Sequence, residues 1–230
     1  MLHAMRLQTR LLFGLVALVV GPAAAQTAPP TTVLPAADSG IFVIRHAGDT
    51  VATERFARTA TTLQGTLDIR NAKNTSQAYE AVVAPDASVP LIEVTVRESL
   101  DSGRVKGKVV QQARVIFKED SVAVDDIRGT GLQTRVFGSE RGAVPYLNLS
   151  FGLLEQAVRR SRASAPASGR VPLFNLGGGQ TLDARISPLG SDSLALAIGS
   201  VEFHLRVDPV GRVLGGRIPS QELVADRVGS

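Results

Sequence analysis

The side chains that could carry out acid–base or metal chemistry are few in this sequence and lie far apart. Downstream of the N-terminal segment the histidines are His46 and His204. Neither has a second histidine or a glutamate at metal-site spacing, and a zinc site needs three or four converging ligands. The adjacent carboxylates Asp125-Asp126 and Glu119-Asp120 would point to opposite faces of a strand. We therefore expect packing or surface histidines, solvated strand and turn carboxylates, no metal and no cofactor.

Nucleophilic catalysis is equally poorly supported. The chain has no Gly-x-Ser-x-Gly, Ser-x-x-Lys or phosphate-loop motif, and it contains no cysteine. The absence of cysteine excludes thiol nucleophiles, cysteine-ligated zinc, iron–sulfur clusters and disulfides. Gly177-Gly178-Gly179 lacks the lysine and helix that follow a phosphate-binding loop, and it is predicted to be a hairpin turn. The sequence thus predicts a protein that is not an enzyme.

Composition argues against two further classes of binding protein. The chain has eight Phe, two Tyr and no Trp, whereas platforms for single-stranded nucleic acid, like sugar clefts, depend on stacked aromatic rings. The formal net charge of +4 falls to +2 once Arg6 and Arg10 are removed with the leader described next. So small an excess does not indicate nucleic-acid binding. The abundant Val, Leu, Ile and Ala suit plain packing or a lipid-like ligand.

The N-terminal residues have the three parts of a secretory signal peptide. Arg6 and Arg10 precede an apolar run from Leu11 to Val20. Small residues then lead to an expected cleavage site after Ala25. Ten apolar residues are far fewer than the roughly 20 that span a bilayer. We expect a cleaved Sec-type signal at residues 1–25, a flexible leader at 26–40 and one β-rich domain at 41–230. The protein would then be exported, to the periplasm or the medium, with no integral membrane segment left.

A single segment of the mature chain is predicted to be helical, the stretch from Val144 to Arg160. Leu147, Phe151 and Leu154 lie on one helical stripe, and neighbouring leucines widen its apolar face beyond half the circumference. A face of that width predicts a buried helix. Asn148 is the expected N-cap.

The rest of the chain alternates with the period of β-strands. Ile92, Val94 and Val96, for example, alternate with polar residues, which indicates a strand buried on one face. Short runs of this kind precede and follow the helix. The predicted fold is mainly β: a strongly curved antiparallel sheet, or partial barrel, of about a dozen strands wrapped on one central helix. A two-sheet sandwich is the alternative, but it leaves the helix without a place.

Two motifs resemble a known group of bacterial envelope domains. The closing pattern comprises Val207-Asp208-x-x-Gly211-Arg212-Val213-Leu214, Ile218-Pro219 and Val224-x-x-Arg227, and the opening hairpin runs from Phe42 to Glu54. Both are similar to the families of unknown function DUF6134 and DUF3108. The resemblance spans about Ile41 to Arg227 and implies an exported domain shaped like the half-barrels of periplasmic lipoprotein carriers. It supplies no catalytic residues.

Two functions of different classes remain. The first is a binding domain that holds a lipid or another hydrophobic small molecule between the concave sheet face and the helix. The alternative is an envelope protein–protein interaction or structural domain with a filled core, whose protein partner is unknown. The residues expected to line the ligand site are Phe42, Ile44, Val94, Val96, Phe151, Leu154, Phe203 and Leu205.

Overall fold

In the computed structural model of the chain, the described residues are 37–70, 74–98, 107–129, 131–164 and 169–229. The predicted signal peptide and residues 26–36 of the predicted leader lie outside them. The described residues belong to one compact unit, Leu34–Ser230. The first strand begins at Asp38, a little before the predicted start of the domain.

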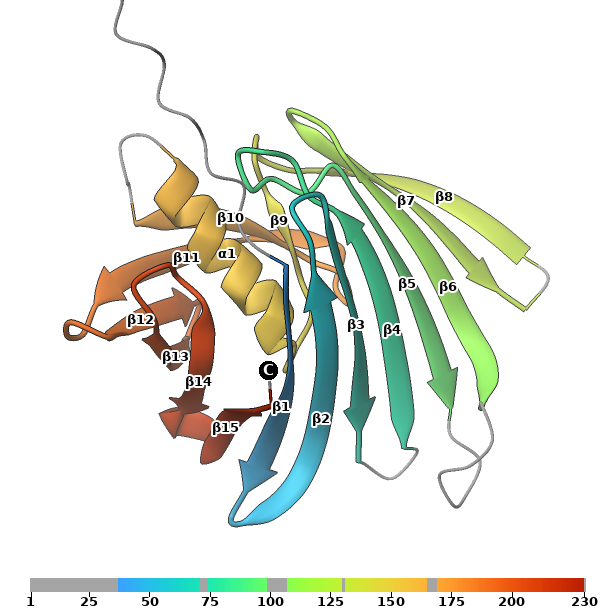
Figure 1. Ribbon diagram of the computed structural model, residues 1–230. Coiled ribbons are helices and arrows are strands. Elements are labelled where there is room, and N and C mark those ends of the chain that lie inside the picture. The colour runs from blue at the N-terminus through green and yellow to red at the C-terminus, as the bar shows by residue number, and fades with distance from the viewer. Residues whose placement is uncertain (1–36, 71–73, 99–106, 130, 165–168, 230) are drawn as a thin grey trace, which may run out of the picture. The chain divides into compact units, whose positions relative to one another are not determined.

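Fifteen strands form one sheet in this unit (Figure 1). The strands that precede the helix are β1 (Asp38–His46), β2 (Asp49–Arg58), β3 (Thr62–Ile69), β4 (Thr75–Val82), β5 (Leu91–Glu98), β6 (Lys108–Phe117), β7 (Ser121–Arg128), β8 (Gly131–Gly138) and β9 (Val144–Tyr146). Those that follow it are β10 (Arg170–Asn175), β11 (Gln180–Pro188), β12 (Ser193–Ile198), β13 (Val201–Val207), β14 (Val213–Ile218) and β15 (Leu223–Val228). A short 3-10 helix, η1 (Pro219–Gln221), joins the last two strands.

The strand order is that of two meanders, which are joined by the pairing of the first strand with the last. From one edge the order is β8-β7-β6-β5-β4-β3-β2-β1-β15-β14-β13-β12-β11-β10-β9. Every neighbouring pair is antiparallel except β9 with β10, which is parallel. The pairing of β1 with β15 places the first and last strands in the middle of the sheet. The predicted mainly β, curved, non-closed sheet is confirmed, with more strands than the predicted dozen.

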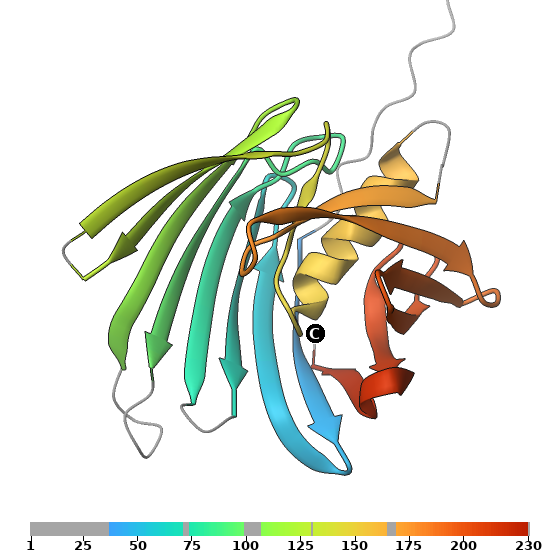
Figure 2. The ribbon, with the colours of Figure 1, turned by 180° about the vertical axis from the view of Figure 1, so that it is seen from behind.

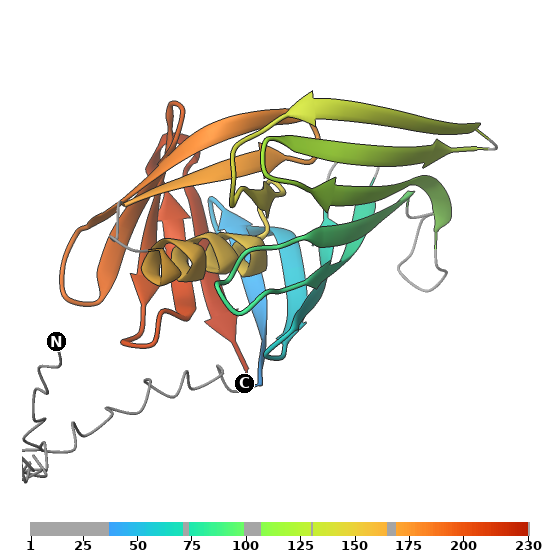
Figure 3. The same cartoon turned by 90° about the horizontal axis from the view of Figure 1, so that it is seen from above.

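The helix α1 (Phe151–Ala163) lies inside the curve of the sheet and packs against β2, β9, β10 and β14. Figure 3 shows it between β10–β14 on one side and β1–β3 on the other, whereas β6–β8 extend beyond its first turn. It is the only α-helix among the described residues, and no described helix is long and apolar enough to cross a membrane.

The start of α1 differs from the prediction. Ser150, not Asn148, is the N-cap, and its hydroxyl accepts a hydrogen bond from the Leu153 amide at 3.3 Å. Val144–Tyr146 is extended and pairs with β10, so the predicted first helical turn is the strand β9. The apolar period alone could not distinguish a helix from a strand here, because pairing with residues 29 positions downstream decides the backbone conformation.

Candidate functional site

The register of β4 to β8 determines which side chains point to the concave face. Val94 pairs with Ala113, and Ala113 with Asp126, so these three share one row across the sheet. Two residues along, the neighbouring row contains Val96 and Gln111. Since successive residues of a strand alternate between faces, the inner surface of this region combines aliphatic side chains with a few polar ones.

A cavity of about 300 Å³ lies on this inner face, between β4–β8 and the loop that joins β10 to β11. Figure 2 shows that β10 and β11 lie on the same side of the sheet as α1. The residues that line the cavity are Gln77, Val94, Val96, Gln111, Ala113, Val115, Val124, Asp126, Arg128, Arg135, Phe137, Leu147, Phe174, Leu176, Gly177, Gly178 and Gly179.

Two buried oxygen atoms in the cavity wall have no hydrogen-bond partner in the described part of the chain. They are Oδ1 of Asp126 and Oε1 of Gln77. The other oxygen of Asp126 lies 3.0 Å from Nε of Arg128 and 3.9 Å from Nη2 of Arg135. Because buried polar atoms are normally paired, two free acceptors in one cavity mark places where a ligand or water can donate a hydrogen bond.

The burial of Asp126 corrects the expectation of a solvated carboxylate. Its side chain is 8% exposed, because its strand continues the inner face beyond α1 and its side chain lies on that face. Asp125 is the outward neighbour and accepts a hydrogen bond from the Thr134 hydroxyl at 2.7 Å. Alternation alone predicts that the two carboxylates separate, but which of them is buried depends on the tertiary structure.

Three aromatic rings, one each from β6, β8 and β10, pack together beside the cavity. The ring of Phe174 lies 5.9 Å from that of Phe117 and 5.8 Å from that of Phe137, measured between centroids. Gly179 has φ of +65°, and a Cβ at this position would lie 2.7 Å from the Phe137 ring. Glycine is therefore required here both by the backbone and by the close contact, and the three glycines form the hairpin turn that the sequence predicts.

The structure divides the eight predicted ligand-site residues into two groups. Val94 and Val96 line the cavity. None of the other six lines it, and each is at most 1% exposed within the core around α1. The rings of Phe42 and Phe151, for example, are 5.3 Å apart. The cavity therefore lies beside the helix and not beneath it.

A buried carboxylate from β2 holds the first turn of α1. Glu54 accepts hydrogen bonds from the Ser150 hydroxyl at 2.5 Å, the Gly152 amide at 2.9 Å and the Tyr79 hydroxyl at 2.7 Å. Burial raises the pKa of Glu54, although these hydrogen bonds oppose the rise. Burial also raises the pKa of Tyr79 well above its usual value, and the neighbouring Glu54 adds to that rise. A carboxylate is well placed here, because free amides and the helix dipole favour negative charge.

A second buried carboxylate, Glu155 in the middle of α1, links the helix to both halves of the sheet. Its carboxylate lies 3.4 Å from Nε of Arg58 on β2 and 3.6 Å from Nη1 of Arg227 on β15. It also accepts a hydrogen bond from the Val213 amide at 2.9 Å. Arg159 completes its partners at 2.9 Å. Burial lowers the pKa of Arg58, and the charge of Glu155 raises it. The side chains of Glu155, Arg58 and Arg227 are at most 8% exposed, and their contacts fix the position of the helix against the sheet.

No pattern in the sequence marks these polar residues as a group. Glu54 and Arg227 stand in the two motifs that resemble the envelope families, which was the available signal. The helical pattern also placed Glu155 and Gln156 next to a wide apolar face, and both are fully buried. Their partners lie about 60 to 100 residues away, so only the folded chain reveals the network.

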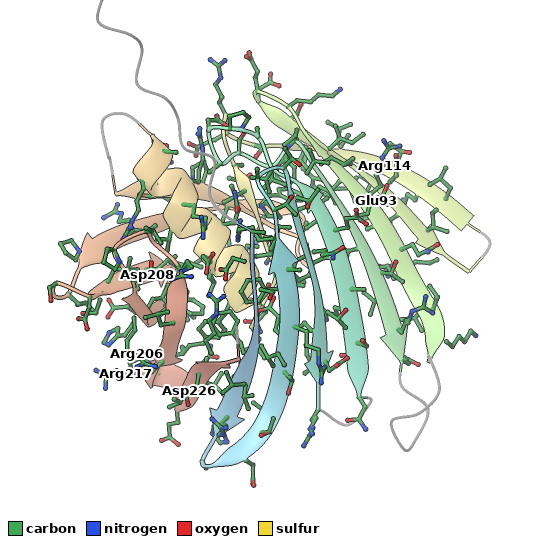
Figure 4. The ribbon with its side chains drawn as sticks, in the orientation of Figure 1. Glu93, Arg114, Arg206, Asp208, Arg217 and Asp226 are labelled. Atoms are coloured by element: carbon green, nitrogen blue, oxygen red, sulfur yellow. The ribbon has the colours of Figure 1, made fainter. Side chains whose placement is uncertain are left out.

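The outer face of β12–β15 carries a larger but open groove of about 630 Å³ over Gly216. Arg206, Arg217 and Asp226 lie beside it (Figure 4). Its charges are satisfied internally, since Asp226 pairs with Arg45 at 3.1 Å and with Arg206 at 3.5 Å. Arg217 donates to Nδ1 of His204 at 3.2 Å. We favour the smaller inner cavity, because it is the one that holds unpaired buried atoms.

The two histidines lie on separate strands, each with one carboxylate neighbour. Nε2 of His46 is 3.9 Å from Glu222, and Nε2 of His204 is 2.5 Å from Glu202. In the described segments, no group of three or more His, Cys, Asp or Glu side chains could hold a metal ion.

Comparison with known proteins shows similarity at the level of the fold. The chain matches the crystal structure of a DUF1089 family protein from Pseudomonas aeruginosa with a TM-score of 0.53 and 14% identity, over 74% of this chain and 90% of that one. It also matches the β-barrel-like DUF1849 protein from Brucella abortus with a TM-score of 0.51 and 10% identity, over 85% and 96%. No protein-family model and no curated protein matches the sequence. The chain thus has the β-barrel-like fold of these domains of unknown function.

Proposed function

We propose that this protein is an exported, non-catalytic domain that binds a small amphipathic molecule, lipid-like in character, in the cavity under β4–β8. The observation that carries the proposal is the combination of an aliphatic and aromatic lining with two unpaired buried acceptors, Asp126 Oδ1 and Gln77 Oε1. Ligand sites commonly consist of such an apolar wall with a few polar groups that fix orientation.

The size of the cavity limits the ligand. A volume of about 300 Å³ stands at the lower end of the range of small-molecule sites. It suits a compact molecule or one chain of a larger lipid, with the rest outside the mouth. The two free oxygens accept hydrogen bonds, so the polar part of the ligand should carry a donor such as a hydroxyl, an amine or an amide.

Export and the relation to envelope carriers belong to the same proposal. The signal-like residues 1–25 and the motifs similar to DUF6134 and DUF3108 support it, and so does the curved sheet around a helix, the form expected of lipoprotein-carrier half-barrels. The difference from such a carrier is in the location of the site, because α1 fills the middle of the curve and the cavity lies beyond its first turn.

The test is native mass spectrometry of the chain from Gln26 to Ser230 after expression in a bacterial periplasm, with organic extraction of bound material. We expect an adduct of lipid or metabolite mass that denaturation releases. Ala113→Phe, which fills the cavity, should abolish the adduct. Ala78→Phe is the matched control, because Ala78 is the outward neighbour of Tyr79 on β4, and it should retain the adduct.

Two results would contradict the proposal. One is a bare polypeptide mass that does not change on incubation with envelope lipids. The other is an adduct that survives in Ala113→Phe. A bare mass would favour the alternative, an envelope interaction or structural domain that acts through its surface.

A further inference from the structure

The strand β8 is an edge of the sheet with an unusually open surface. It stands at one end of the sheet order and pairs with β7 alone. On its outward face Leu132 is 66% exposed and Val136 is 70% exposed, and Ile127 of β7, opposite Leu132, is 41% exposed. The strand contains no Pro and no Lys, two residues that protect an edge from pairing, and its one charged residue is Arg135 on the inner face.

The pairing of β8 with β7 determines which of its backbone groups are free. The Ser139 amide donates to the Asp120 carbonyl at 2.9 Å, which makes Ser121 and Gly138 a non-hydrogen-bonded pair. Hydrogen-bonded and non-hydrogen-bonded pairs alternate along an antiparallel ladder. The amides and carbonyls of Leu132, Thr134 and Val136 therefore point away from β7. Within the described residues these groups have no backbone partner. The Thr181 hydroxyl donates to the Gly138 carbonyl at 3.3 Å and so closes the edge at that end.

We infer that β8 is the interface of a symmetric homodimer, in which the β8 strands of two copies pair antiparallel about a two-fold axis at Thr134. In this register Thr134 faces Thr134, and Leu132 faces Val136 of the other copy. These are the residues whose backbone groups are free. The three hydrogen-bonded pairs therefore use all of those groups and bring together the exposed apolar side chains on one face.

The sequence of β8 favours a second copy over an unrelated strand, because it is complementary to itself in this register. On the inner face Arg135 would lie opposite Gln133 of the partner copy, and within one chain Arg135 already donates to Gln133 at 3.0 Å. Phe137 would face Gly131, so the largest side chain meets the smallest. No two like charges lie directly opposite each other, and a two-fold interface requires such self-complementarity.

The first test is the mass of the chain from Gln26 to Ser230 by sedimentation equilibrium over a wide concentration range. We expect a concentration-dependent dimer. Val136→Lys should raise the dissociation constant by about ten-fold or more, because it places a charge opposite Leu132 on both sides of the axis. Val210→Lys is the matched control, since Val210 is 68% exposed in the turn before β14, and it should leave the constant unchanged.

Thr134→Pro provides a second variant should Val136→Lys fail to fold. It removes the edge amide, which makes no bond to β7, together with the hydroxyl bond to Asp125 on the outer face. The backbone ladder between β7 and β8 remains, and the dimer is lost. A wild-type chain that stays monomeric at every concentration overturns the inference. A dimer that both variants retain overturns the proposed interface.

Disulfide trapping tests the register, and the chain has no native cysteine to interfere. Thr134→Cys should form a covalent dimer under mild oxidation, because directly paired Cα atoms are about 5.5 Å apart. Leu132→Cys should not cross-link to itself but should cross-link to a chain carrying Val136→Cys. Self-cross-linking of Leu132→Cys as fast as that of Thr134→Cys overturns the register.

Discussion

The sheet has two regions that share one backbone architecture but differ in what covers their concave face. Over β1–β3 and β10–β15 the covering element is α1, and side chains such as Phe42, Phe151 and Phe203 are at most 1% exposed. Over β5–β8 none of the described residues forms a covering helix, and the inner face retains a cavity with polar atoms in its wall. In both regions the alternation of side chains along the strands produces the apolar inner face. The length of the 13-residue helix then determines how far the filled core extends along that face.

Buried charge follows the same division. In the helix-filled region Glu155 has four partners, three arginines and a backbone amide. In the cavity region Asp126 has two arginines beside one oxygen and none beside the other. A fully paired carboxylate positions an element, and a half-paired one is available to a ligand.

One of the two largest effects is expected from Glu155→Gln, which keeps the shape of the side chain and removes its charge. It leaves Arg58 and Arg227 buried with an amide for a partner and should lower the free energy of unfolding by about 3–5 kcal/mol. Urea titration at neutral pH measures this. Glu93→Gln is the control, because Glu93 and Arg114 form an exposed pair at 3.8 Å (Figure 4). It should change the value by less than about 0.5 kcal/mol, and equal losses for both would contradict the division.

Truncation of one aromatic residue in each region compares their packing directly. Phe151→Ala should lower the free energy of unfolding by about 3–5 kcal/mol, since the ring is fully buried beside Phe42. Phe137→Ala should cost about 1–2 kcal/mol, because this half-buried ring borders the cavity. Thermal and urea unfolding measure both. A loss at Phe137 as large as that at Phe151 would show that the second region is as tightly filled as the first.

Asp126→Asn tests whether the cavity carboxylate contributes to ligand binding more than to the stability of the fold. Its ion pairs involve arginines that are 65% and 49% exposed, so the free energy of unfolding should change by less than about 1 kcal/mol. The ligand adduct seen by native mass spectrometry should fall. A strong loss of stability with an unchanged adduct would assign Asp126 to the fold.

The smallest effect concerns pH and Glu54. Burial raises its pKa, so the folded state keeps this proton at pH values where the unfolded chain releases it. The contribution of Glu54 to stability is therefore complete below the unfolded pKa of about 4.5 and is lost as pH rises through the raised folded value. Glu54→Gln should flatten this part of the curve of stability against pH. Parallel wild-type and variant curves between pH 4 and 8 would contradict it.

The candidate site was predictable in part. Val94 and Val96 could be assigned to the inner face because their strand alternates cleanly. The expectation that Phe151 and Leu154 line a ligand site followed from the width of the helical face, but such a face serves equally well as solid core. The sequence predicts a solvated Asp126, whereas the structure buries it. The burial of a strand residue depends on what lies opposite its face, and no local pattern contains that information.

The sequence by itself determined the class of fold, because strand and helix periods are properties of neighbouring residues. A mainly β, curved antiparallel sheet around one apolar helix followed from those periods. The tertiary structure decided where that helix begins, since β9 pairs with β10 and Glu54 accepts hydrogen bonds from the Ser150 hydroxyl and the Gly152 amide. It also decided where the cavity lies, because contacts between segments far apart in the chain set how far the helix fills the curve.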